Sequence, residues 1–412
     1  MAGSKLQAPR GTFDVLPADA VRRDRLVGLS AHVLEGAGYA HTETPIFEDT
    51  ALFARGVGES TDIVQKEMFT FEDKGGRSLT LRPENTAGFC RAYIEHGMHK
   101  LPQPVKLWSW GPFFRHEAPQ AGRYRQFTQL DVEALGSDDP SLDAELIVLL
   151  AQILERSGVK ARLLLSSLGN ADTRAEYGEE LRAHLGAHES ELSDEVRSRI
   201  DTNPLRAFDS DHPGTRSAME EAPRLIDRLD REDTDHFGEV RALLEEAGCA
   251  YELDPTLVRG LDYYTRTVFE FESDDLGAQR GVGGGGRYDG LVEKLGGPAT
   301  PGVGWAAGVE RVLLASQREV EGAYFPMRAY VVVPKAEERP LAFRLVQALR
   351  DAGALAEMEQ AGRSVKGQMK QADRVDATHV VIAGDSLEVR DMQTGEQHEV
   401  ASVEDAVRAV TQ

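Results

Sequence analysis

The chain has 412 residues, of which 41% are hydrophobic and 28% are charged, and its formal net charge is −22 at pH 7. At roughly 100 to 200 residues per domain this length predicts two or three domains, and no apolar run approaches the ~18 residues that a membrane span needs. The negative charge argues against a surface that binds nucleic acid non-specifically, because phosphate contacts need local positive charge, but it does not exclude a local basic site.

The N-terminal residues and the cysteines indicate the compartment. The first residues, MAGSKLQAPRGTFDVLPAD, lack the apolar stretch of a secretory signal. Cys90 and Cys249 are the only cysteines, and they lie far apart without the spacing of a metal or redox site. We therefore expect a protein of the reducing cytoplasm that does not engage a membrane.

The order of the patterns along the chain predicts an α+β organisation. Helical periodicity over residues 18–38 predicts a first helix. From about residue 40 to 168, strand-like runs recur, namely SLTL, VKLWSW and RQFTQLDVEAL. Residues 169–250 hold 21 Asp and Glu against 10 Arg and no Lys in short helical segments, which predicts an inserted helical module. Strand character returns in TRTVFEFE, before a glycine run and an apolar helix around 306–316.

The C-terminal residues follow a different pattern. AYVVVP, ALAEME and THVVIAGD are predicted strands, and they alternate with the predicted helices PLAFRLVQALRDAG and SVKGQMKQADR. This alternation predicts a small α/β domain with a mostly parallel sheet. Ser402, with Asp405 three residues later, predicts the start of a final helix. We place the domain boundary between residues 1–325 and 326–412.

Residues 115–133, RHEAPQAGRYRQFTQLDVE, combine a loop with a strand that is polar on one face. VKLWSWGPFFR and RQFTQLDVEAL are predicted strands, and HEAPQAGRY between them carries the Pro and Gly of a loop, so the pair is predicted to form an antiparallel hairpin. Because side chains alternate along a strand, Phe127, Gln129, Asp131 and Glu133 share one face. Taken alone, this pattern is more typical of a surface hairpin with a solvated face.

Three further motifs favour a ligand site. RGLDYYTR places Arg259 beside two tyrosines on opposite faces of an incoming strand, which suits a carboxylate next to an aromatic ligand; an aromatic core is the alternative. GVGGGGRYDGL allows close backbone approach to a ligand, although a glycine run is more often a loop. PGVGWAAGVERV places Arg311 in the first turn of a helix, where it can meet a polyphosphate; close packing of that helix on a sheet explains the glycines equally well.

Together, these motifs resemble those of histidyl-tRNA synthetase, a class II aminoacyl-tRNA synthetase, over nearly the full length of the chain. TPIFEDTALF is similar to class II motif 1, which in the family forms the dimer interface; FFRHEAPQAGRYRQF is similar to motif 2 and PGVGWAAGVERV to motif 3. RGLDYYTR and GGGGRYDG are similar to the two histidine-specific motifs. The resemblance implies an antiparallel-sheet catalytic domain with a helical insertion, followed by an α/β anticodon-binding domain.

The resemblance also implies an activity. A homodimer would activate L-histidine with ATP to histidyl-adenylate and pyrophosphate, and then transfer histidine to the 3′ end of histidine tRNA. Because the attacking group is already a carboxylate, the first step needs alignment and charge neutralisation rather than a general base. Mg²⁺ is expected to bridge the phosphates, and the sequence assigns it no protein ligand.

Residue matches to the family motifs imply individual roles. Arg115 and Arg259 are the expected catalytic pair, which grips the α-phosphate from opposite sides. The expected ATP contacts are Arg115, Glu117, Arg123, Phe127 and Arg311, and the expected histidine contacts are Glu84, Thr86, Gln129, Glu133, Arg259, Tyr263, Tyr264 and Tyr288. Within that second set, Glu84, Thr86 and Gln129 match ammonium-binding positions, whereas Glu133 and Tyr264 match positions that read the imidazole.

Contacts with tRNA are expected in two places. Gln120 and Arg125 match positions near the acceptor end of the tRNA. Lys366 and Lys370 lie four residues apart on one face of a predicted C-terminal helix, which suits phosphate contacts; a solvated helix face explains these lysines equally well.

Two positions in the expected site do not follow the family pattern or receive no role from it. Asn85 stands where the family usually has Gly, so the edge of the pocket is expected to differ there. Asp131 shares the polar strand face with Gln129 and Glu133, and the resemblance gives it no role.

Two other functions compete with the enzyme. The main rival is a regulatory paralogue that binds histidine and partners the ATP phosphoribosyltransferase of histidine biosynthesis. Such paralogues lose parts of the histidine motifs and the C-terminal domain, and this chain keeps both. The third interpretation, a nucleic-acid-binding accessory protein on the same scaffold, predicts tRNA binding without activation of histidine.

Overall fold

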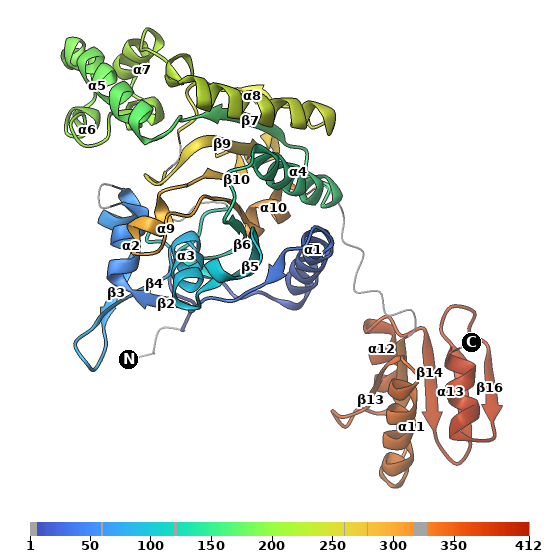
Figure 1. The fold of residues 1–412 in the computed structure, drawn as a ribbon. Helices are drawn as coiled ribbons and strands as arrows, with labels where there is room; N and C mark the ends of the chain where they lie inside the picture. The colour runs from blue at the N-terminus through green and yellow to red at the C-terminus, as the bar shows by residue number, and fades with distance from the viewer. Residues whose placement is uncertain are drawn as a thin grey trace, which may run out of the picture. The chain divides into compact units, whose positions relative to one another are not determined.

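The computed structural model describes residues 6–58, 61–118, 122–258, 260–277, 279–316 and 328–411. The chain divides into two compact units, Met1–Val320 and Glu321–Gln412 (Figure 1). The predicted boundary at Phe325 and Pro326 lies outside the described residues. In the described ranges, no helix combines the length and the apolar character needed to cross a bilayer.

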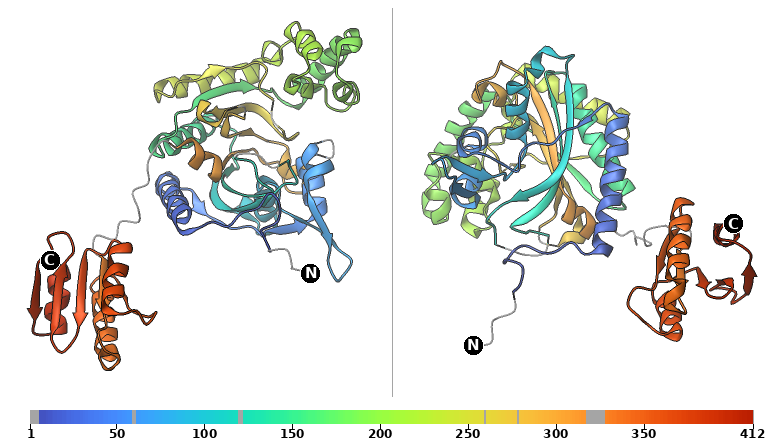
Figure 2. Two further views of the ribbon diagram at one scale, coloured as in Figure 1. Left: turned by 180° about the vertical axis from the view of Figure 1, so that it is seen from behind. Right: turned by 90° about the horizontal axis from the view of Figure 1, so that it is seen from below.

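An eight-stranded sheet forms the centre of the first unit (Figures 1 and 2). Its strand order is β1-β5-β6-β11-β10-β9-β7-β8. Neighbouring strands pair antiparallel except at the two edges, where β1 pairs with β5 and β7 with β8 in parallel. The strands span β1 Ala40–His41, β5 Val105–Phe114, β6 Gln126–Leu135, β7 Arg162–Ser167, β8 Glu252–Leu253, β9 Thr265–Glu272, β10 Gly281–Arg287 and β11 Gly302–Gly308. The predicted antiparallel sheet and the β5/β6 hairpin are therefore confirmed.

Helices on both sides cover this sheet. The helices of the first unit outside residues 169–250 are α1 Pro17–Gly36, α2 Thr50–Val57, α3 Thr86–Glu95, α4 Pro140–Arg156, α9 Leu291–Lys294 and α10 Val309–Ala315. A small antiparallel sheet, in the order β2-β4-β3, consists of β2 Phe47–Asp49, β3 Phe69–Glu72 and β4 Ser78–Leu81. Elsewhere in the chain, short 3₁₀ helices span Met98–Lys100, Glu189–Glu191, Pro204–Asp209, Leu225–Arg228, Asp274–Leu276 and Ala336–Glu338, and a π-helical turn spans Ile63–Glu67.

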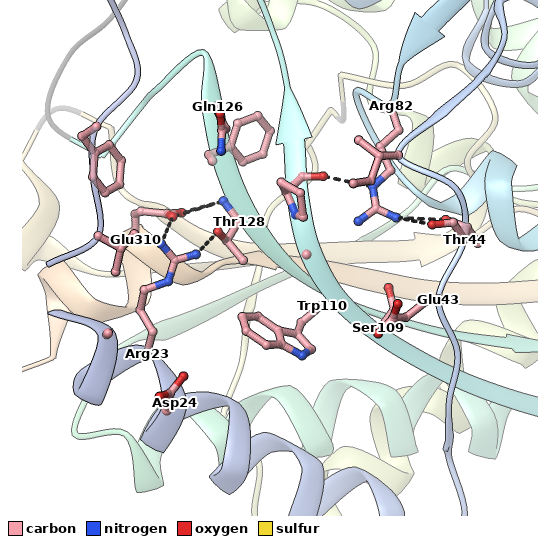
Figure 3. Close-up of a pocket in the computed structure, with 17 residues that line it drawn as sticks. Arg23, Asp24, Glu43, Thr44, Arg82, Ser109, Trp110, Gln126, Thr128 and Glu310 are labelled. Atoms are coloured by element: carbon pink, nitrogen blue, oxygen red, sulfur yellow. Dashed lines mark hydrogen bonds and ion pairs between the residues drawn. The ribbon is translucent and has the colours of Figure 1, made fainter. Parts of the chain in front are cut away.

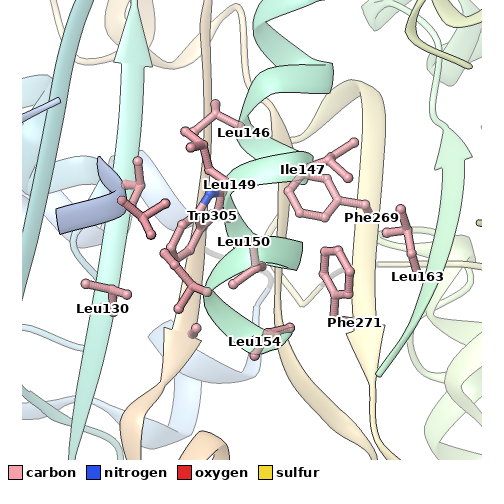
Figure 4. Close-up of a cluster of buried hydrophobic side chains, with 14 of the residues drawn as sticks. Leu130, Leu146, Ile147, Leu149, Leu150, Leu154, Leu163, Phe269, Phe271 and Trp305 are labelled. Carbon is pink, nitrogen blue, oxygen red and sulfur yellow. The ribbon is translucent and has the colours of Figure 1, made fainter. Parts of the chain in front are cut away.

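Helix α4 packs the main apolar core against one face of the sheet (Figure 4). Asp139 caps its first turn by accepting a hydrogen bond from the Ser141 amide at 2.9 Å, and Pro140 occupies a first-turn position. The apolar residues of α4 recur at three- to four-residue spacing and so line one side of the helix. The buried core includes Leu146, Ile147, Leu150 and Leu154 of α4, Leu130 of β6, Phe269 of β9 and Trp305 of β11. The face of β6 that carries Leu130 is thus the core face, and its alternate residues point the other way.

Residues 169–250, all of which are described, contain helices and no strand. The helices are α5 Ala171–Ala187, α6 Asp194–Arg197, α7 Pro213–Glu220 and α8 Arg231–Glu246. Leu181 and Leu185 of α5 belong to a cluster that also holds Ala218 of α7. Phe237 and Val240 of α8 instead belong to the main core beside α4. The last helix of the predicted insertion therefore packs as part of the layer that covers the large sheet.

The second unit holds a five-stranded sheet in the order β13-β12-β14-β15-β16. Its elements are β12 Arg328–Val332, α11 Arg339–Asp351, β13 Leu355–Met358, α12 Val365–Arg374, β14 His379–Ala383, β15 Leu387–Asp391, β16 Gln397–Val400 and α13 Val403–Thr411. The Asp405 amide donates to the Ser402 hydroxyl at 3.1 Å, so the predicted cap of α13 is confirmed.

The prediction of a mostly parallel sheet is wrong for half of this unit. Strands β12, β13 and β14 are parallel, but β15 and β16 add an antiparallel hairpin to β14. Gly395, whose φ is 76°, lies in the turn of that hairpin. The hairpin strands carry many charged residues, so their apolar alternation is weak.

Three other sequence predictions need correction. The glycine run is strand β10 rather than a loop. Strand β10 lies so close to β11 that a Cβ on Gly285 would overlap the Gly304 carbonyl, which explains why this strand is rich in glycine. Tyr263 and Tyr264 precede β9 in a turn instead of pointing to opposite faces of a strand, and their ring centroids lie 4.8 Å apart. The helix expected around 306–316 begins only at Val309, because the residues before it pair with β6 and β10.

A buried ion pair joins β10 to α4. The side chains of Arg287 and Asp143 are both 0% exposed. The Arg287 Nε donates to the two carboxylate oxygens of Asp143 at 3.2 and 3.1 Å, and Nη1 donates to the Ser137 carbonyl at 2.9 Å. The guanidinium therefore compensates the charge that Asp143 brings into the core.

Replacing one partner of this pair is expected to destabilise the protein strongly. Arg287→Met leaves Asp143 buried without its cation and should lower the free energy of unfolding by about 3–5 kcal/mol. The double substitution Arg287→Met with Asp143→Leu removes both charges of this pair and should recover part of that loss, because Asp289, 3.1 Å from Arg287, still loses its cation. Urea unfolding followed by circular dichroism measures both variants, and a single substitution that costs less than about 1 kcal/mol would contradict the assignment.

Candidate active site

The face of β6 opposite the α4 core lines two adjoining cavities. The first cavity, of about 190 Å³, and the second, of about 160 Å³, share Arg115, Gln129, Gly284 and Ala306 in their walls. Each is smaller than the ~300–1,000 Å³ of sites for drug-sized ligands. The shared wall indicates one elongated site with two compartments, each suited to a small group.

All five residues predicted to contact ATP line the first cavity: Arg115, Glu117, Arg123, Phe127 and Arg311. The Arg123 guanidinium donates to Glu117 at 3.0 Å and to the Gln279 side chain at 2.7 Å. Burial and the nearby Arg123 lower the pKa of Arg311. Three arginines thus line this cavity beside Glu117, Glu270 and Glu310, and an anion in it would offset the burial and the repulsion from Arg123 that act on Arg311.

Arg115 stands between the two cavities. It follows the end of β5, and its Nε donates to the Pro83 carbonyl at 2.9 Å. Its guanidinium carbon lies 5.3 Å from the centroid of the Phe127 ring. These contacts orient the group at the junction, where a negative charge of a ligand in either cavity lies within its reach.

The second cavity contains most of the residues predicted to contact histidine. Glu84, Thr86, Gln129, Tyr263, Tyr264 and Tyr288 line it. Glu133 lies behind this wall, where it accepts hydrogen bonds from the Thr86 hydroxyl at 2.5 Å and from the Tyr288 hydroxyl. Arg259 lies outside the described residues.

The second cavity is rich in buried carboxyl groups. Burial raises the pKa of Glu84 and of Asp131. Burial also raises the pKa of Glu133 to about 8, against the lowering effect of its hydrogen bonds from Thr86 and Tyr288. This compartment is therefore short of positive charge, in contrast to the arginine-lined first cavity.

Two glycines make room for the side chains of Glu133 and Tyr288. Gly304 of β11 pairs with Glu133 across the sheet, and a Cβ on Gly304 would overlap the Glu133 carboxylate. A Cβ on Gly302 would overlap the Tyr288 ring. The sequence interpretation of these two glycines was close packing of a helix on a sheet; in the structure they make room for the side chains that form the wall.

Glu84 and Asn85 begin helix α3. Glu84 accepts hydrogen bonds from the amides of Thr86 at 2.8 Å and Ala87 at 3.2 Å. The Asn85 amide donates to the Ser109 hydroxyl at 2.8 Å and its oxygen accepts from the Thr44 hydroxyl. The polar side chain that replaces the family's usual glycine thus ties α3 to β5 and to the segment before β2.

The residues predicted to contact tRNA fall into separate places. Gln120 lies outside the described residues. The Arg125 backbone amide donates to the Gly11 carbonyl at 2.7 Å, so Arg125 lies against the N-terminal segment. Lys366 and Lys370 are exposed on α12 of the second unit, with Arg374 one turn further along.

A larger pocket of about 520 Å³ lies beside α1 (Figure 3). Of the predicted site residues, only Phe127 lines it. The Arg23 side chain from α1 donates to the Thr128 hydroxyl and lies 3.5 Å from Glu310, which accepts from the Thr128 amide at 2.9 Å. These contacts hold the residues next to Phe127 and Arg311.

Sequence reasoning missed several residues that shape the first cavity. Gln279 accepts from Arg123, and its carbonyl accepts from Arg311 at 2.5 Å. Glu270 of β9 and Glu310 of α10 also line this cavity. Glu270 alternates with apolar residues in TRTVFEFE, so the argument used for β6 could have placed it on a polar strand face. No local sequence pattern predicts a role for Gln279.

Comparisons with known proteins bear on this site. The profile of a family described as histidyl-tRNA synthetase matches residues 11–312, and a profile described as anticodon binding domain matches residues 329–412. A protein of Rubrobacter xylanophilus named histidine–tRNA ligase is 49% identical over 410 residues, which cover 95% of this chain and 96% of that protein.

Solved structures agree with these matches. The crystal structure of apo S. aureus histidyl-tRNA synthetase is 36% identical with a TM-score of 0.82, covering 99% of this chain and 100% of that one. A Bacillus halodurans structure, titled as an ATP phosphoribosyltransferase regulatory subunit/histidyl-tRNA synthetase, is 24% identical with a TM-score of 0.66, covering 90% of this chain and 97% of that one. At that identity the second likeness shows the fold alone.

The raised pKa of Glu133 predicts a pH-dependent stability. A carboxyl whose pKa rises from the ordinary 4.5 to about 8 on folding stabilises the protein fully below its unfolded pKa, and this contribution is lost as the pH rises towards 8. The ligand-free protein should therefore lose stability relative to Glu133→Gln between about pH 6 and pH 8. Thermal unfolding of both proteins across this range measures the difference. Glu84 and Asp131 are present in both proteins, so parallel curves would refute the effect of Glu133.

Proposed function

The chain belongs to the histidyl-tRNA synthetase family, and from this premise we propose that it activates L-histidine with ATP and transfers the histidyl group to the 3′ end of histidine tRNA. One observation carries the proposal: an arginine-lined cavity and a carboxyl-lined cavity meet at Arg115. A polyphosphate suits the first compartment and an amino acid suits the second. Their junction is where the two substrates would react.

The first step is attack of the histidine carboxylate on the α-phosphorus of ATP, with pyrophosphate as the leaving group. The nucleophile carries its own negative charge, so the protein has to align the two groups and to stabilise the charge that develops on the phosphate oxygens. Arg115, held by the Pro83 carbonyl, is placed to do both. Arg259 keeps the role that the sequence implies, on the opposite side of the α-phosphate.

The other residues of the first cavity would hold the nucleotide. Phe127 would stack on the adenine, Glu117 would hydrogen-bond it, and Arg123 and Arg311 would hold the outer phosphates. Without ligand, Glu117 and Arg123 are 3.0 Å apart as an ion pair, so this pair has to open when ATP enters. The phosphates replace the carboxylate as the partner of Arg123, which frees Glu117 for the base.

We expect ATP to enter as its Mg²⁺ complex. Within the described residues, no group of three or more His, Cys, Asp and Glu side chains is arranged to hold a metal ion. Three carboxylates, Glu117, Glu270 and Glu310, line the first cavity, and Glu310 already accepts a hydrogen bond from the Thr128 amide. This set fits an ion held mainly by phosphates and water with one or two carboxylates, which is the usual coordination of Mg²⁺.

The second cavity would select histidine by its two ring nitrogens. Glu133 is positioned by the Thr86 and Tyr288 hydroxyls, and Tyr263 and Tyr264 close the same wall. An amino acid without the ring nitrogens would leave these buried polar groups unpaired, which is how a hydrogen-bonding site rejects analogues strongly. We therefore assign Glu133 and Tyr264 to recognition of the imidazole.

Recognition of tRNA is proposed for two regions. Residues 326–412, which include the matched anticodon binding domain, would bind the anticodon end, with Lys366 and Lys370 on the phosphates. Gln120 and Arg125 would approach the acceptor end. Because the net charge is −22, binding would depend on such local basic positions and would be sensitive to salt.

We also propose a cytoplasmic homodimer. Exposed apolar side chains cluster in the sequence around α1 and β2: Phe13, Val15, Leu16, Ile46 and Phe47. Exposed apolar patches mark interaction surfaces, and Ile46 and Phe47 lie in the segment that resembles class II motif 1. The reaction serves translation, which places the protein in the cytoplasm.

The regulatory paralogue is less well supported. A protein that only senses histidine has no need for the three arginines that line the first cavity. The second unit, which resembles an anticodon binding domain, has no evident purpose in such a sensor.

The enzyme is expected to exchange pyrophosphate into ATP only when histidine is present. Exchange follows from reversible formation of histidyl-adenylate and needs no tRNA. The measurement uses purified full-length protein with labelled pyrophosphate, and omission of histidine or its replacement by glutamine serves as control. Absence of histidine-dependent exchange would favour the regulatory paralogue or the accessory protein.

Charge reversal on α12 is expected to impair tRNA charging alone. Lys366→Glu with Lys370→Glu should raise the KM for tRNA about tenfold or more and lower the salt dependence of binding by about two counterions. Pyrophosphate exchange should stay unchanged, because it involves the first unit. Arg339→Glu with Arg344→Glu, which reverses two exposed charges of α11 in the same unit, is the matched control. Equal effects of the two pairs would contradict a specific contact by α12.

A further inference from the structure

Asp131 is a buried carboxyl in the wall of the second cavity that lacks a partner. Asp131 is 2% exposed, and its Oδ2 has no hydrogen-bond partner among the described residues. The Oε1 of Gln129, which is 9% exposed, also lacks a partner in the described part of the chain. A buried acceptor without a partner destabilises the protein, because it has lost its hydrogen bonds to water. Two such acceptors in one cavity wall indicate a ligand that donates a hydrogen bond to each of them.

The neighbouring arginines do not compensate Asp131 directly. Arg82 and Arg115 act on it electrostatically. However, Arg82 donates to the Pro112 carbonyl and to the carbonyl and hydroxyl of Thr44, each at 3.0 Å. The Nε of Arg115 donates to the Pro83 carbonyl. Within the described residues, neither guanidinium forms an ion pair or a hydrogen bond with Asp131, so a structural salt bridge does not explain this carboxyl.

The position of Asp131 along β6 relates it to one part of an amino-acid ligand. Phe127 lines the first cavity, Gln129 lines both cavities, and Asp131 lines the second. Glu133 lies beyond them, bound to Tyr288. A histidine with its carboxylate at Arg115 and its imidazole near Glu133 has its α-ammonium group beside Gln129 and Asp131.

The groups expected to bind the ammonium are already partly engaged without ligand. Both Glu84 oxygens accept from the amides that begin α3. The Thr86 hydroxyl donates to Glu133. An ammonium group brings three N–H donors, and each needs an acceptor when buried. Among the described residues of the second cavity, the Gln129 Oε1 and the Asp131 Oδ2 accept no hydrogen bond.

We propose that Asp131 is a specificity-determining residue of the amino-acid site, where its free carboxylate oxygen and the Gln129 Oε1 accept hydrogen bonds from the α-ammonium group of the substrate, with Glu84 as the third acceptor. The inference rests on the proposed activation of histidine and adds a residue to which the family resemblance gives no role. Analogues without an ammonium group leave both acceptors unpaired and are rejected for that reason. Burial raises the pKa of Asp131, so a cation next to this carboxyl would stabilise its charged form.

Asp131→Asn tests this assignment, because it keeps the shape and removes the charge. Isothermal titration of the full-length protein compares L-histidine with 3-(imidazol-4-yl)propanoate, which has the same carboxylate and ring but no ammonium group. The substitution should weaken histidine binding about tenfold to a hundredfold and leave binding of the propanoate unchanged. In pyrophosphate exchange, the KM for histidine should rise while the KM for ATP stays constant.

Ligand-free stability separates a binding role from a structural one. Removing an uncompensated buried charge should leave the thermal midpoint of Asp131→Asn unchanged or raise it. Asp131→Ser, a smaller uncharged variant, should behave alike. Thr267→Val is the matched control, since it removes another buried oxygen without a described partner, from a residue of β9 that lines neither cavity. It should leave the affinity for histidine unchanged.

The possible outcomes are distinct. Wild-type protein that binds histidine, together with Asp131→Asn that binds it within about twofold of wild type, overturns the inference and leaves the proposed function intact. Equal losses for histidine and the propanoate, or a lowered ligand-free midpoint, show a structural role and also overturn it. Wild-type protein that binds no histidine overturns the proposed function itself.

Discussion

The alternation of side chains along β6 is the constraint on which both the core and the site depend. The strand is held on both sides, by β5 over Val105–Phe114 and by β11 over Gly302–Gly308. Leu130, Val132 and Ala134 enter the core beside α4, whereas Gln129 and Asp131 of the opposite face line the cavities and Glu133 lies behind their wall. A shift of one residue in register would exchange the two sets, placing carboxyls in the core and leucines in the site. The paired strands therefore secure the chemistry of the site as well as its shape.

The distribution of charge in the site orders the substrates. Arginines surround the first cavity, whereas carboxyls dominate the second and have pKa values raised by burial. A ligand that is anionic at one end and cationic beyond the junction is the best match for this pattern. The unpaired groups cost stability in the free protein, which the apolar core offsets. Arg115 is held in place by the Pro83 carbonyl, whereas Arg123 has to exchange its partner Glu117 when an anion arrives.

Periodicity predicted much of this arrangement, because it reports which side chains share a face. The β5/β6 hairpin, the polar face of β6 and the C-terminal alternation of strands and helices all follow from it. Strand β10 was missed because glycines carry no side chains whose alternation can be read, although its neighbours require them. The charged β15/β16 hairpin gave a weak apolar signal for a related reason. Contacts such as Gln279 with Arg123 join residues far apart in sequence, and no local pattern predicts them.

The resemblance to a family and the geometry of the chain contribute different information about the site. Motif matches name Phe127 and Arg311 as nucleotide contacts, but they say nothing of what holds these residues. In the structure, the neighbours of both residues are joined, because the Thr128 amide donates to Glu310 at 2.9 Å. Arg23 of α1 binds Thr128 and lies 3.5 Å from Glu310. Helix α1 thus holds the neighbours of two proposed nucleotide contacts at once. Since sites on rigid elements are held more precisely than sites on loops, the geometry of the first cavity depends on a helix that no family motif includes.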